Sequence, residues 1–142
     1  MKSWLLTAIL LLSLAGVAVS SVSLYYHYDK SESSFCDFGG KFNCDIVNRS
    51  IYSHIGPIPV ALIGVLGYLS LAVMAHFCRK RSDGKTFLLI SSLVGLGFAF
   101  YLTYLEGFVL AAWCVLCLTS LALIFTITIL AATFALRANR SI

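Results

Sequence analysis

Five cysteines are the residues of this sequence best suited to chemistry, and two of them stand close together. Cys114 and Cys117 enclose two apolar residues in a C-x-x-C motif. Residues three apart lie on one face of a helix, near enough for a disulfide after a modest adjustment. At the start of a helix, unpaired N–H groups and the helix dipole favour the thiolate, which is the reactive form of cysteine. The motif therefore indicates a redox-active pair.

A second pair, Cys36 and Cys44, is eight residues apart and encloses Gly39 and Gly40. A loop of this length with two glycines can close a disulfide without strain. From the spacing alone, the pair is either an inert disulfide that braces a loop or one that exchanges with the C-x-x-C cysteines.

Long apolar segments must position these cysteines. Of the 142 residues, 60% are hydrophobic and 11% are charged, whereas an ordinary soluble domain has about 25% charged residues. About 20 helical residues cross a bilayer core, and four runs without Asp, Glu, Lys or Arg are that long. They predict an all-α membrane protein, a single domain over residues 1–142 with four transmembrane helices. The expected spans are about 4–28, 57–77, 86–105 and 110–136.

The first apolar run has an alternative interpretation as a secretory signal peptide, since Lys2 precedes it and Ala18-Val19-Ser20 resembles a cleavage site. The run is longer than the apolar core of a signal peptide, which is about 7–15 residues. It also ends in Tyr25, Tyr26 and Tyr28, which suit a membrane interface. We therefore expect it to remain as the first helix.

The basic residues predict the orientation, because Lys and Arg are enriched in cytoplasmic loops. Seven of the ten lie at the N-terminus, between the second and third spans, and in the C-terminal tail: Lys2, Arg79, Lys80, Arg81, Lys85, Arg137 and Arg140. Both termini are therefore expected on the cytoplasmic side of the membrane. We expect this membrane to be a bacterial inner or plasma membrane. The outer loop, residues 29–56, is expected on the periplasmic or lumenal side.

This topology separates the cysteines by compartment. Cys36, Cys44, Cys114 and Cys117 fall on the side where disulfides persist, and Cys78 falls on the reducing side. A zinc site would need four thiolates kept reduced in the oxidising compartment, so no metal is expected. The net charge of +4 is modest and sits in topology-determining loops, so nucleic acid is not an expected partner.

These features together resemble the vitamin K epoxide reductase family, over nearly the whole chain. The combination of a cysteine pair eight apart, a following serine and a C-x-x-C before the last helix is specific. The matching elements are Cys36 and Cys44, Ser50, Gly56-Pro57-Ile58-Pro59, the third-span segment 89–95, Tyr101-Leu102 and Cys114-Val115-Leu116-Cys117.

The resemblance implies a four-helix bundle around a quinone of the ubiquinone, menaquinone or vitamin K type, capped by the outer loop. It also implies a thioredoxin-fold (DsbA-like) dithiol protein as the electron donor. Cys36 would react with the thiol of that partner, and Cys44 would pass electrons to Cys114. Cys117 would then face the quinone, and Ser50 would contact it.

Two positions depart from the vertebrate members that reduce the epoxide. Those members have an Asn early in the second helix and a Tyr four residues after the C-x-x-C, where this sequence has Val60 and Leu121. A site lined by Val60 and Leu121 favours a plain quinone over an epoxide. The sequence has no thioredoxin-like domain, so we expect the partner to be a separate chain and the protein to be a monomer surrounded by lipid.

The function expected from these features is a membrane thiol:quinone oxidoreductase that supports disulfide formation. A vitamin K quinone or epoxide reductase proper is the alternative within the enzyme class, and a non-catalytic membrane protein with structural disulfides is the alternative outside it.

Two further expectations concern the third span. Ser91 and Gly95 are interpreted as helix-packing positions, and Glu106, at the outer end, is expected among lipid headgroups, with a proton-relay role as the alternative.

Overall fold

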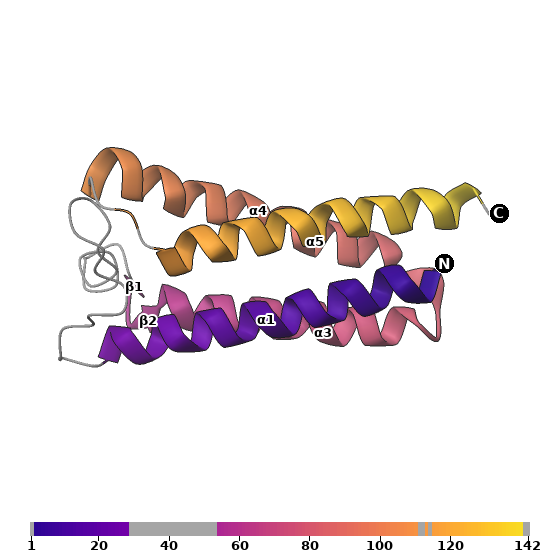
Figure 1. The fold of residues 1–142 in the computed structure, drawn as a ribbon, viewed down its shortest axis with the longest axis horizontal. Helices are drawn as coiled ribbons and strands as arrows, with labels where there is room; N and C mark the ends of the chain where they lie inside the picture. The colour runs from indigo at the N-terminus through magenta and orange to yellow at the C-terminus, as the bar shows by residue number, and fades with distance from the viewer. Residues whose placement is uncertain (1, 29–53, 111–112, 114, 141–142) are drawn as a thin grey trace.

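The computed structural model describes residues 2–28, 54–110, 113 and 115–140, and four long helices in this part of the chain form an antiparallel bundle (Figure 1). The helices are α1 (Lys2–Tyr28), α3 (Val60–Cys78), α4 (Lys85–Tyr104) and α5 (Val115–Arg140). Each is long and apolar enough to cross a membrane. The prediction of an all-α membrane bundle with four spans is confirmed.

Most of the outer loop falls outside the described residues. Cys36, Cys44, Ser50 and Cys114 are among the positions not described, so the capping role of the loop stays a prediction.

The helix ends differ from the expected spans by a few residues. α3 begins at Val60 rather than at 57, and α5 extends over Val115–Arg140 rather than 110–136. After α4, the chain continues as a π-helix, η3 (Leu105–Leu110). Counting charges locates the apolar part of a helix, whereas the hydrogen-bonded helix can begin later or continue past the first Arg.

A two-stranded hairpin directly precedes α3. Strand β1 (His54–Ile55) pairs antiparallel with β2 (Ile58–Pro59). Gly56 in the connecting turn has φ +60°, a conformation that glycine adopts without steric cost. Pro59 then occupies the N-cap of α3, where its missing N–H leaves no helical hydrogen bond unmade.

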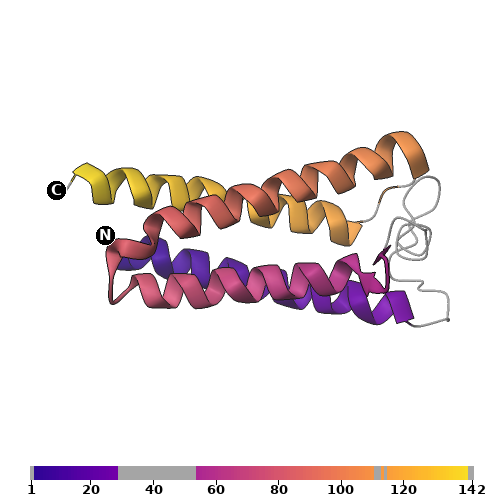
Figure 2. The same ribbon diagram turned by 180° about the vertical axis from the view of Figure 1, so that it is seen from behind.

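Both termini lie at one end of the bundle (Figures 1 and 2), which we call the closed end because of its buried core. Most of its buried core is there, built by the first halves of α1 and α4 and the second halves of α3 and α5. The cluster comprises Leu5, Leu6, Ile9, Tyr68, Leu71, Ala75, Cys78, Leu88, Ile124, Ile127, Ala131 and Phe134. Hydrogen bonds from Arg79 to Thr7 and from Lys85 Nζ to Asn139 Oδ1, the latter 2.6 Å, join neighbouring helices at this end.

The four helices do not pack equally on one another. α1 lies against both α3 and α5, and α4 lies against α5, whereas α3 and α4 meet at few positions. The 3₁₀ turn η2 (Ser82–Gly84) joins α3 to α4 at the closed end. The bundle therefore consists of two helix pairs joined through α1 and α5, with α3 and α4 separated on the other side.

Replacing Gly16 on α1 with alanine tests the contact between α1 and α3. A Cβ atom at Gly16 would overlap the ring of Tyr68, so Gly16→Ala should lower the free energy of unfolding by about 1–3 kcal/mol through overpacking. The measurement is the thermal unfolding midpoint in detergent.

Gly97→Ala is the matched control, because a Cβ atom added to Gly97 on α4 would meet no heavy atom within 4 Å among the described residues, its own helix backbone aside. That change should stabilise the helix by about 0.5–1 kcal/mol. Equal effects of the two substitutions would contradict the close packing at Gly16.

Candidate functional site

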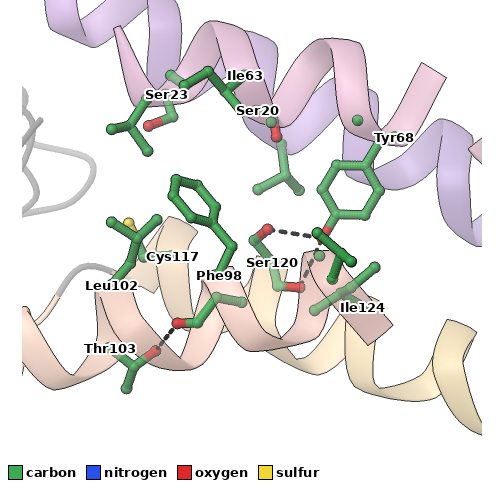
Figure 3. Close-up of a pocket in the computed structure, with 18 of the residues that line it drawn as sticks. Ser20, Ser23, Ile63, Tyr68, Phe98, Leu102, Thr103, Cys117, Ser120 and Ile124 are labelled. Atoms are coloured by element: carbon green, nitrogen blue, oxygen red, sulfur yellow. Dashed lines mark hydrogen bonds between the residues drawn. The ribbon is translucent and has the colours of Figure 1, made fainter. Parts of the chain in front are cut away.

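The half of the bundle away from the termini contains a cavity of about 550 Å³ (Figure 3). Its wall comes from α1, α3, α4, η3 and α5, and most of the lining is apolar. Pockets for small organic ligands and cofactors typically measure about 300–1,000 Å³ and are mainly apolar with a few polar groups. The cavity therefore has the size and character of a ligand site.

The exposed residues of the lining show where the cavity opens. Gly67 and Ser70 of α3 and Ile90 and Val94 of α4 line the cavity and are also exposed. The lining residues of α1 and α5 are buried or half-buried. The opening therefore lies between α3 and α4, in the middle of two apolar helices, where a ligand dissolved in the bilayer would reach it.

One polar contact crosses the cavity at its inner end. The hydroxyl of Tyr68 on α3 donates to the backbone carbonyl of Ser120 on α5, 2.8 Å away, and also lies 2.8 Å from Ser120 Oγ (Figure 3). Thr103 Oγ1 instead donates to the carbonyl of Ala99 within α4, at 2.8 Å. These contacts satisfy the hydroxyls without water, as the interior of a membrane protein requires.

The wall contributed by α4 includes a stripe of small residues four apart. Ser91, Gly95, Ala99 and Thr103 all line the cavity. Gly95 also allows close packing, since an added Cβ would lie 3.3 Å from Ile124 Cδ1. The interpretation of Ser91 and Gly95 as packing positions was therefore incomplete, because the same small side chains leave the space of the cavity.

Cys117 lies on the wall of this cavity (Figure 3). It is the third residue of α5, so its backbone lies in the first turn, where the helix dipole carries its positive end. The lining residues Ser120 and Ile124 follow three and seven positions later on the same face. The structure thus places the second cysteine of the C-x-x-C at the ligand cavity.

Among the other predicted site residues, Val60 also lines the cavity. Leu121 is half-buried on α5 and is not part of the lining, where Ser120 is found instead. Its predicted contact with a quinone stays a prediction. The roles given to Cys36, Cys44, Cys114 and Ser50 also stay predictions, since these residues are not described.

The expectation for Glu106 was wrong. Its side chain is 2% exposed and lines the cavity instead of reaching the headgroups. The reason is that the chain continues after α4 as the π-helix η3, which keeps Glu106 on the inward face. The sequence held a signal for this, because Glu106 follows Leu102, another lining residue, at the helical spacing of four.

Fold and site together define a multi-pass membrane protein with an internal site for an apolar ligand and a cysteine on the wall of that site. The sequence model of the vitamin K epoxide reductase family matches residues 7–132, and the chain belongs to this family. The resemblance drawn from the motifs is confirmed. Membership makes the protein an oxidoreductase of the quinone- or epoxide-reductase type.

Replacing Tyr68 with phenylalanine tests the hydrogen bond across the cavity. Tyr68→Phe removes the donor to Ser120 and should lower the free energy of unfolding by about 1 kcal/mol, the usual net value of one hydrogen bond. Thermal unfolding in detergent measures the change. Tyr101→Phe is the control, because Tyr101 is 56% exposed and outside the cavity. A control that lost as much stability would argue against a structural role of the Tyr68 contact.

Proposed function

We propose that this chain is a membrane thiol:quinone oxidoreductase. It takes electrons from a reduced thioredoxin-fold dithiol protein and delivers them to a quinone, and so supports disulfide formation in that partner. The observation that carries the proposal is the position of Cys117 on the wall of an apolar cavity that opens between α3 and α4.

The shape of the cavity supports a quinone as the electron acceptor. An isoprenoid quinone has a flat, mostly apolar head and a long apolar tail. The cavity holds about 550 Å³ for the head, and the opening between two membrane helices lets the tail extend into lipid. The few polar groups, such as Tyr68 and Ser120, are of the kind that orient a ligand in an otherwise apolar pocket.

Two cysteine pairs would carry the electrons in sequence. A thiolate of the partner attacks the disulfide between Cys36 and Cys44, and the reduced pair then attacks the disulfide between Cys114 and Cys117. The resulting dithiol gives two electrons and two protons to the quinone, which becomes a quinol, while the disulfide between Cys114 and Cys117 forms again. The net products are one disulfide in the partner and one quinol.

The lining favours a plain quinone over an epoxide. Val60 puts an aliphatic side chain on the lining, at the position where the vertebrate members that reduce the epoxide have an Asn able to bind its oxygen. An assay that offers both the quinone and its epoxide to the same reduced protein distinguishes these two substrates.

Replacing Cys117 with alanine tests the proposed electron path. Cys117→Ala should abolish quinone-dependent oxidation of a dithiol, because the last disulfide can no longer form. Quinone absorbance during the reaction measures the activity, and thermal unfolding confirms that the bundle is folded.

Cys78→Ala is the matched control, because Cys78 is a free cysteine in the core at the closed end, outside the cavity. It should keep its quinone-dependent activity. Full activity of Cys117→Ala would show that electrons do not pass through this sulfur.

Replacing Cys36 with alanine tests the exchange between the two pairs. With its partner removed, Cys44 should be trapped in a disulfide with Cys114, detectable by mass spectrometry of peptides prepared without reductant. The double variant that also carries Cys114→Ala should lack this crosslinked peptide. An oxidised Cys36→Ala protein in which Cys44 never pairs with either C-x-x-C cysteine would contradict the relay.

A further inference from the structure

Glu106 is an ionisable residue in the cavity, and the proposed electron path does not explain why it is there. It is among the most deeply buried residues of the described chain, at 2% exposure, and it lies on the wall that also contains Cys117. Ionisable residues within membrane spans are costly and usually face functional cavities.

The local helix geometry directs Glu106 to the cavity. Leu105 and Glu106 begin the π-helix η3, and both belong to the cavity lining together with Leu102 and Thr103 one turn earlier. Single π-helical turns at the end of α-helices occur often at functional sites. Glu106 therefore follows Leu102 by four residues and extends the α4 side of the lining toward the end of the cavity where α5 begins.

The reaction itself needs a group that handles protons. Reduction of a quinone by a dithiol moves two protons from sulfur to oxygen, here in a cavity whose lining is mostly apolar. Among the described lining residues, Glu106 has the only carboxyl group. The hydroxyls of Tyr68 and Thr103 are engaged with backbone carbonyls, and neither releases a proton as readily as a carboxylic acid.

We propose that Glu106 relays a proton from the reduced C-x-x-C dithiol to the quinone oxygen, an inference that rests on the proposed function. As the dithiol is oxidised and its electron pair moves to the quinone, the carboxyl group takes up a proton released by a thiol and gives a proton to the oxygen that becomes a hydroxyl. The second proton reaches the other oxygen, two electrons leave sulfur and enter the ring, and Glu106 ends in its starting state.

Replacing Glu106 with glutamine removes the acid and keeps the size of the side chain. The test is a single turnover in which pre-reduced protein meets menadione, a naphthoquinone without a tail, and quinone absorbance is followed. Glu106→Gln should slow this step about 100-fold, the scale of general acid–base catalysis. Asp83→Asn is the control, since Asp83 is an exposed acid in η2 at the closed end, and it should react at the wild-type rate.

Binding of menadione separates a proton role from a binding role. Trp113 packs beside Gly107, since an added Cβ there would lie 3.0 Å from Trp113 Cη2, so quinone bound near Glu106 should quench its fluorescence. In a Trp4→Phe background Trp113 is the remaining tryptophan. Unchanged quenching affinity in Glu106→Gln, together with the slow turnover, supports the proposal. An unchanged turnover rate, or a slow rate explained by weaker binding, overturns it.

A spectroscopic readout serves if Glu106→Gln does not fold. The chain has two glutamates, Glu32 and Glu106, so ¹³C-labelled glutamate in a Glu32→Gln protein marks Glu106 alone. Time-resolved infrared difference spectra, recorded while the reduced protein reacts with menadione, should show a labelled carboxyl band that changes transiently and then returns. A labelled band that stays constant during turnover overturns the relay.

The experiments distinguish a failure of the proton relay from a failure of the proposed function. If wild-type protein does not reduce menadione, or if Cys117→Ala still does, the proposed function fails. If wild-type protein reduces menadione, Cys117→Ala does not, and Glu106→Gln is as fast as wild type, then only the proton relay fails.

Discussion

The packing of α1 against both α3 and α5 holds this bundle together while α3 and α4 remain apart on the opposite side. In lipid there is no hydrophobic drive to close such a gap, because the bilayer is as apolar as the side chains. The core at the end of the termini, around Ile9, Ile127 and Phe134, supplies the close contacts that keep the two helix pairs in register. A cavity can therefore persist in the other half without loss of the fold.

The polar side chains of the bundle make two kinds of hydrogen bond, within their own helix or to another helix. Thr119, Thr126 and Thr133 of α5 donate to carbonyls four residues earlier in their own helix, which satisfies them in a medium without water. Hydroxyls that reach another helix are fewer in the described chain. Thr128 reaches the carbonyl of Ser92 in the core, and Tyr68 reaches Ser120 at the cavity. Contacts between helices thus occur both in the core and at the cavity.

Sequence reasoning predicted the four spans and the family, because long charge-free runs and cysteine spacing are local features. It predicted the cavity only in part. Cys117 and Val60 line it, but Tyr68 and Ser120 were missed, since their contact joins residues 52 positions apart and depends on how α3 faces α5. Glu106 was misplaced because counting charges treats every acid as a span end, whereas the π-helix continues the inward face for another turn.

The link between α4 and α5 constrains where electrons and protons can meet. Only four residues, 111–114, separate the end of η3 at Leu110 from the start of α5 at Val115, and an extended chain spans at most about 3.6 Å per residue. The end of η3 and the start of α5 can therefore be no more than about 18 Å apart. Glu106 lies four residues before Leu110 and Cys117 two residues after Val115, and both line the cavity. The short link and the shared cavity together bring a carboxyl group and a thiol to the same end of the site, away from the Tyr68 contact at the other end.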